Sequence, residues 1–209
     1  MESVRIGSVG PPFSRAPGAA ALAFDLLIRA EAMGLLPEGV EGETRLDSEL
    51  LEQLAQSLIK AGIAVAPAQE LTAARGKRLE AALEAVLEAL DGSPHPEGEW
   101  APARELLGDD LLAVLVGGIS ASSLRRYAGG ERDTPDQVAW RLHVLARILA
   151  ALRGAYNEYG IRWWFERPRV QLEGKTPGSV LLAASKPDDP GVEKVTRLAE
   201  ALAGPGFAT

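Results

Sequence analysis

The feature that most constrains this chain is a regular spacing of large side chains between positions 138 and 156. They recur at steps of four, three, four, three and four residues, and they are Val138, Leu142, Leu145, Leu149, Leu152 and Tyr156. Such steps place side chains on one face of an α-helix, which has about 3.6 residues per turn. We therefore predict a long amphipathic helix, with Thr134 as its N-cap, Pro135 at its first position and Gly160 at its end.

Helical spacing also occurs in most of the remaining chain. We predict further helices over 21–33, 48–61, 71–90, 103–116, 121–128, 161–165, from Pro177 and over 190–202. No segment alternates as a β-strand would, so the predicted fold class is all-α. The leucine-rich face of the helix over 71–90 is expected to be buried within its domain, with pairing to a second copy as the alternative.

Proline and glycine divide the chain into regions. Residues 1–20 have no periodicity, and we predict a mobile arm there. Residues 21–91 form an N-terminal helical region of unknown role. The stretch DGSPHPEGEWAP contains three prolines and two glycines, so we predict a linker over 92–102.

The charge is unevenly distributed. The whole chain carries −7 and residues 1–100 carry −8, whereas residues 101–170 carry +2, with all of their positive charge from arginine. Arginine suits bidentate contacts with phosphate and guanine, so a local DNA-binding surface is compatible with an acidic chain. The absence of cysteine, of a signal-peptide pattern and of a long apolar run leads us to expect a cytoplasmic protein without a membrane span.

Residues that would carry catalysis are scarce. His95 and His143 have no obvious partners for a metal site or a catalytic triad. The sequence Gly174-Lys175-Thr176 lacks the earlier glycine of a P-loop, and the segment 118–122 lacks the last glycine of a nucleophile elbow. We therefore expect no enzymatic activity, no catalytic residues, no metal and no cofactor.

Residues 103–128 have the pattern of a helix-turn-helix. A first helix is interrupted by Gly117-Gly118, and Ser120 can cap the following helix, ASSLRRYA. Ala121, Leu124 and Ala128 are predicted to form its buried face. The residues predicted to contact DNA are Ser120, Ser122, Ser123, Arg125, Arg126 and, just beyond the helix, Arg132. The alternative is that these arginines are ordinary surface residues.

Residues 104–182 resemble the Xre/MbcA/ParS antitoxin family. One matching segment runs from Ile119 to Tyr127 and continues into Gly130-Glu131-Arg132 and Thr134-Pro135, similar to the family's Xre-type helix-turn-helix. The other comprises Trp164-Phe165-Glu166-Arg167-Pro168 and Leu172-Glu173-Gly174-Lys175-Thr176-Pro177, similar to its C-terminal toxin-binding domain.

The resemblance implies a homodimer or higher oligomer that binds operator DNA through 103–159 and a RES-domain toxin through 160–209. Such toxins consume NAD or transfer its ADP-ribose, so NAD would be the partner's substrate. The predicted partner-binding residues are Trp163, Trp164, Arg167, Arg169 and Lys175. Of the three consecutive aromatic residues 163–165, two are expected to pack in the core and one to be exposed. A stand-alone transcriptional regulator and an interaction module without DNA binding are the alternatives.

Overall fold

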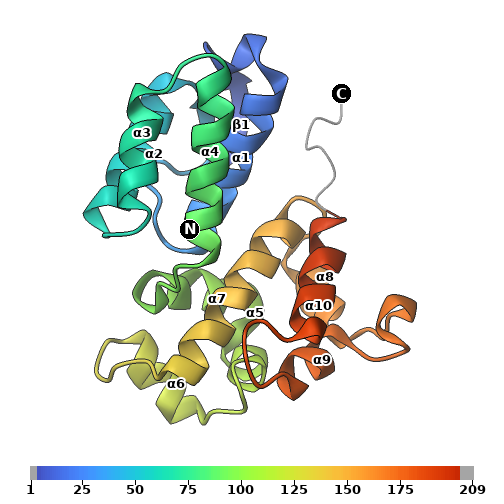
Figure 1. The fold of residues 1–209 in the computed structure, drawn as a ribbon. Helices are drawn as coiled ribbons and strands as arrows, with labels where there is room; N and C mark the ends of the chain where they lie inside the picture. Colours follow the sequence, from blue (N-terminus) through green and yellow to red (C-terminus); the bar gives the residue numbers. More distant parts are fainter. Residues whose placement is uncertain (1–3, 203–209) are drawn as a thin grey trace. The chain divides into compact units, whose positions relative to one another are not determined.

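The computed structural model describes residues 4–202, which divide into two compact units with a boundary between Ser93 and Pro94. The described part is all-α apart from one pair of short strands (Figure 1). In chain order the elements of the first unit are β1 (Arg5–Val9), η1 (Phe13–Arg15), α1 (Pro17–Ala32), β2 (Glu43–Leu46), α2 (Ser48–Lys60), α3 (Val65–Ala73) and α4 (Lys77–Asp91). Those of the second are α5 (Pro96–Leu115), α6 (Ala121–Ala128), α7 (Asp136–Arg153), α8 (Glu158–Glu166), η2 (Val170–Leu172), α9 (Pro177–Ala183) and α10 (Pro190–Glu200).

The predicted mobile arm over 1–20 is wrong for the described residues, and its positions 1–3 lie outside them. β1 pairs in parallel with β2, which corrects the expectation of no strand. The Val4 N–H donates to Glu31 Oε1 at 3.0 Å, and the Phe13 side chain is buried in the core of the unit. The sequence did not predict these strands, because each is short and pairs with a segment about 40 residues away. Such pairing leaves little local pattern in the sequence.

The helices of the first unit enclose a core of leucine, valine and alanine. Asp47 caps α2, since its side chain accepts the Glu49 and Leu50 N–H groups. The single helix predicted over 71–90 is wrong, because the chain forms α3 and α4 with Gly76 between them. Gly76 has φ +57° and ψ −133°, a backbone conformation that side chains disfavour. The leucine-rich face of α4 is buried within the unit, as expected.

α7 is the central helix of the second unit. It packs against α5, α8 and α10, and α9 and α10 lie beside each other (Figure 1). The predicted apolar stripe from Val138 to Leu152 is buried. Both predicted ends are wrong. The Thr134 hydroxyl accepts the Trp100 indole N–H at 3.0 Å and does not cap the helix. The helix ends at Arg153, and Asn157 caps α8 through the Gly160 N–H.

The linker predicted over 92–102 is correct only for its first residues. Pro96 occupies the first helical position of α5, where a missing N–H has no cost, and Trp100 is buried. Gly108, at φ +72° and ψ 162°, interrupts α5 and separates residues 109–115 as a short helical segment. No helix between residues 4 and 202 is long and apolar enough to cross a membrane.

Candidate functional site

The predicted DNA-reading segment is α6, whose bounds match the prediction residue for residue. The Ser120 side chain accepts the Ser123 N–H at 3.1 Å and caps the helix. Leu124 is fully buried and belongs to the core of the second unit, and α6 packs against α5. A single leucine thus anchors an eight-residue helix, with Tyr127 and Ala128 half-buried beside it.

The outward face of α6 carries three of the predicted contact residues. Ser122, Arg125 and Arg126 are exposed, and spacings of three and four residues make them neighbours on the helix surface. Ser123 is half-buried, and the Ser120 hydroxyl donates to the Ser123 hydroxyl oxygen at 3.0 Å. Both serines therefore take part in the N-cap of α6. The predicted burial of Ala121 is wrong, since this residue lies in the exposed first turn.

The turn between α5 and α6 depends on two glycines. Gly117 has φ +117° and Gly118 has φ +73°, conformations that other residues adopt only with strain. The Gly118 and Ile119 N–H groups both donate to the Ala113 carbonyl at 3.0 Å, which closes the end of α5. The turn directs the chain so that Leu124 enters the core while the arginines of α6 remain exposed.

Arg132 lies beyond α6 and is exposed, as predicted. Its guanidinium carbon is 5.7 Å from the centre of the Tyr127 ring, a cation–π contact. The Tyr127 ring in turn stacks on Trp100, with ring centres 6.3 Å apart. These stacked groups connect the loop after α6 to the core, and the sequence pattern did not reveal them.

An ion pair lies beside the start of the short helical segment 109–115. Arg104 donates from Nε and Nη2 to the two carboxylate oxygens of Asp109 at 2.8 and 3.0 Å. The hydrogen bond from Arg104, with smaller electrostatic contributions from Arg104 and Arg125, holds the pKa of Asp109 below its usual value. The stabilisation is therefore present at neutral pH and decreases as the pH falls through that lowered pKa. Solvent exposure keeps it small.

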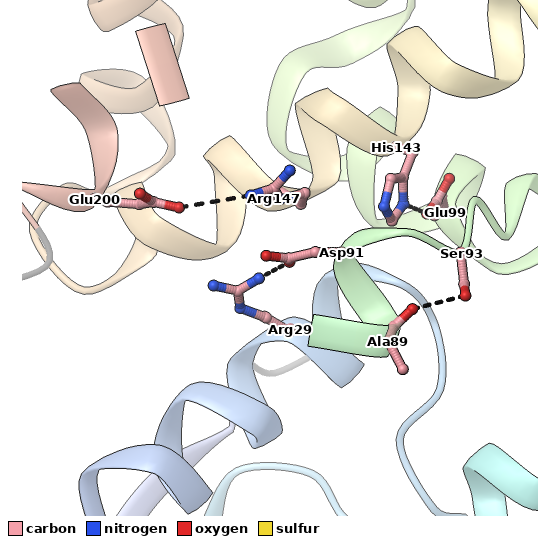
Figure 2. Close-up of polar contacts among 8 residues, drawn as sticks. All are labelled: Arg29, Ala89, Asp91, Ser93, Glu99, His143, Arg147 and Glu200. Atoms are coloured by element: carbon pink, nitrogen blue, oxygen red, sulfur yellow. Dashed lines mark hydrogen bonds and ion pairs between the residues drawn. The ribbon is translucent and has the colours of Figure 1, made fainter. Parts of the chain in front are cut away.

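Other arginines of the segment 101–170 have structural roles. The Arg141 guanidinium donates to the carbonyls of Leu181 and Ala184 at the end of α9, and the Arg162 Nε donates to the Leu106 carbonyl at 2.8 Å. Arg147 faces Glu200 (Figure 2). The exposed arginines that remain around α6 are Arg125, Arg126 and Arg132.

A second surface lies at α8, where the predicted partner-binding residues separate into exposed and buried groups. Trp163 is 43 % exposed, whereas Trp164 is 1 % exposed and packs edge-on against the buried Phe165. The expectation of one exposed and two buried aromatic residues is thus confirmed, but Trp164 is too buried to anchor a protein partner. The exposed predicted residues are Trp163, Arg167 and Lys175, with Arg169 half-buried.

Sequence reasoning missed a buried polar pair. His143 Nδ1 lies 2.6 Å from Glu99 Oε1, and the side chains are 6 % and 0 % exposed (Figure 2). The same carboxylate oxygen accepts the His95 N–H at 3.3 Å. The pair joins α5 to α7 across 44 residues of sequence, so no local signal marks it. Among the described residues, no group of three or more histidine, aspartate or glutamate side chains forms a potential metal site.

Comparisons with protein-family models, curated proteins and solved structures found no match to this chain. Two surfaces of the second unit are therefore the starting point for its function. They are the arginine-bearing face of α6 and the aromatic and basic surface at α8.

Proposed function

We propose that this chain is a sequence-specific DNA-binding regulator that uses α6 as its recognition helix. The observation that carries the proposal is the exposed set of Ser122, Arg125 and Arg126 on a capped helix, held by the buried Leu124. Arginine on the outer face of a helix can reach guanine edges in the major groove, and serine hydroxyls can bind phosphates. Residues 109–128 would then act as a helix-turn-helix.

The resemblance to Xre/MbcA/ParS antitoxins extends the proposal to a biological role. In that role the chain is a cytoplasmic antitoxin without catalytic activity, acts as a dimer or larger oligomer on operator DNA and represses its own operon. Its surface at α8 binds and neutralises a RES-domain toxin. The N-terminal unit lies outside the segment that resembles the family, and we assign it no function.

Replacement of both Arg125 and Arg126 by alanine tests the DNA-binding proposal. Selection from a random duplex library identifies a site, and fluorescence anisotropy measures affinity at two salt concentrations. The double variant should bind about a hundredfold more weakly, because one lost bidentate base contact costs about 1–3 kcal/mol. The slope of its log affinity against log salt concentration should also become less negative, because two positive charges are lost near the DNA phosphates.

A charge-matched control removes two exposed basic residues from α10 in the same unit. Lys194→Ala with Arg197→Ala lowers the net charge equally but leaves α6 intact. This control should retain most of the wild-type affinity for the selected site. Equal losses in the two double variants would mean that only overall charge matters, and undiminished binding by the Arg125/Arg126 variant would exclude α6 as the recognition helix.

A second candidate function is protein binding without DNA binding, favoured by the aromatic residues exposed at α8. Tyr159 and Trp163 are 69 % and 43 % exposed, with ring centres 5.9 Å apart. Exposed tryptophans beside arginines are common anchors of interfaces.

Co-expression with a RES-domain toxin tests the protein-binding surface. Trp163→Ala should reduce co-purification of the toxin at least about tenfold, since truncation of an interface anchor costs about 2 kcal/mol or more. The Arg125→Ala, Arg126→Ala variant should co-purify normally. If the Trp163 variant retained the toxin at wild-type levels, the interface would lie elsewhere; if the wild type retained none, this class of partner would be excluded.

A further inference from the structure

A pocket of about 320 Å³ lies at α8 and combines aromatic walls with positive charge. It is lined by Tyr156, Tyr159, Gly160, Trp163, Trp164, Arg167 and Arg169. Among the described residues, two guanidinium groups line it and no carboxylate does. The pocket therefore has the composition of a site for a negatively charged group with a flat apolar portion.

Two hydrogen-bond donors of the pocket residues have no acceptor within residues 4–202. The indole Nε1 of Trp164 and the Nε of Arg169 are both buried without a partner. A buried donor without a hydrogen-bond partner lowers the stability of the folded protein by about 1–3 kcal/mol. The indoles of Trp100 and Trp140, by contrast, donate to Thr134 Oγ1 at 3.0 Å and Gln137 Oε1 at 3.1 Å. The unsatisfied indole thus belongs to a residue that lines the pocket.

The guanidinium groups are held by stacking and not by ion pairs. The Arg169 guanidinium carbon lies 5.5 Å from the centre of the Trp164 ring, and that of Arg167 lies 5.2 Å from the centre of the Trp163 ring. Neither arginine forms a salt bridge to a carboxylate within residues 4–202. Stacking restrains a guanidinium while leaving its edge available for an oxyanion.

The backbone around Arg169 is also restrained. Its N–H donates to the Lys175 carbonyl at 3.0 Å, and its own carbonyl accepts the Leu172 and Gly174 N–H groups at 3.0 and 2.9 Å. At another lining residue, Gly160, a side chain would bring Cβ to 2.9 Å from Cδ1 of Tyr156. The absence of a side chain at Gly160 therefore allows the Tyr156 ring to lie close to α8.

We propose that this pocket binds an oxyanion, a carboxylate or a phosphate, carried by a ligand with an aromatic portion. Its oxygens would accept hydrogen bonds from the Trp164 indole and the Arg169 guanidinium, with Arg167 adding charge at the rim. A water molecule could accept one of these bonds but would supply no negative charge to pair with the two guanidinium groups. The proposal rests on the partner-binding part of the proposed function and names the chemistry recognised there, but its test needs neither DNA nor toxin.

Nuclear magnetic resonance of the ¹⁵N-labelled full chain tests the proposal through the indole N–H signals of its four tryptophans. The probes are N-acetylphenylalanine, its neutral amide and phenyl phosphate. Trp164→Phe assigns the Trp164 signal. That signal should shift in a saturable way with at least one anionic probe and stay in place with the amide, while the Trp100 and Trp140 signals stay unchanged. The probe that binds more tightly identifies the carboxylate or the phosphate as the preferred group.

Two variants connect the response to the pocket. Arg169→Gln should weaken binding of the anionic probe at least about tenfold, because a charge-assisted contact is lost. Arg197→Gln, on the exposed face of α10, removes the same charge and should leave the affinity unchanged. A Trp164 signal that ignores both anions, responds equally to the neutral amide, or still responds with wild-type affinity in Arg169→Gln would overturn the proposal. DNA binding by α6 would stand in each of these cases.

Discussion

Replacement of Leu124 by alanine is expected to destabilise the second unit by about 3 kcal/mol and to abolish specific DNA binding. Leu124 is fully buried, and it is the one buried residue of α6. An isolated helix of eight residues is unstable in water, so α6 depends on this contact with the core. Loss of the leucine side chain leaves a cavity and weakens the attachment of the face that carries Arg125 and Arg126.

Urea denaturation followed by tryptophan fluorescence measures this effect in the second unit alone, because all four tryptophans lie between residues 100 and 164. Val114→Ala is the matched control, since Val114 is 47 % exposed at the end of the neighbouring α5. The control should change the unfolding free energy by no more than about 0.5 kcal/mol. An unchanged midpoint in Leu124→Ala would show that α6 is not held by this side chain.

Glu99→Ala is expected to lower the unfolding free energy of the same unit by about 3 kcal/mol. The substitution removes the acceptor for the His95 N–H and the carboxylate that lies 2.6 Å from His143 Nδ1. It also leaves a cavity at a site where the glutamate side chain is 0 % exposed. The same fluorescence-monitored denaturation gives the value.

Glu99→Gln separates the hydrogen bond from the packing. Glutamine keeps the shape of the side chain and one carbonyl oxygen. The unfolding free energy should therefore fall by about 1 kcal/mol, roughly the cost of a weakened hydrogen bond. Glu97→Ala, two residues earlier and exposed, should have an effect within about 0.5 kcal/mol. Equal stability of all three variants would mean that the Glu99–His143 pair does not contribute to joining α5 and α7.

Helix α6 shows how far local sequence signals extend. Its two ends agree with the prediction because a serine at the cap and glycines after the last turn act within a few residues. The same holds for Asp47 at the start of α2 and for Thr176, which accepts the Ser179 N–H at the start of α9. Such signals need no knowledge of the rest of the chain.

The candidate sites were only partly predictable. Periodicity placed Arg125 and Arg126 on the outer face of α6, and both are exposed. The same reasoning did not distinguish Trp163 from Trp164, because adjacent residues of a short helix differ only by about 100° and the covering elements decide which one is buried. It also gave no sign that Arg141 and Arg162 bind distant carbonyls.

The sequence by itself determined the helical class, most helix positions and a division of the chain at the start of the predicted linker 92–102, because apolar spacing, caps and glycines act over a few residues. Only the tertiary structure decided the parallel strand pair, the Glu99–His143 contact, the engagement of Thr134 by Trp100 and the pocket beside α8. Each of these depends on groups that lie far apart in the chain or on which face a neighbouring element covers. Such contacts form through packing of the whole unit and leave no local pattern.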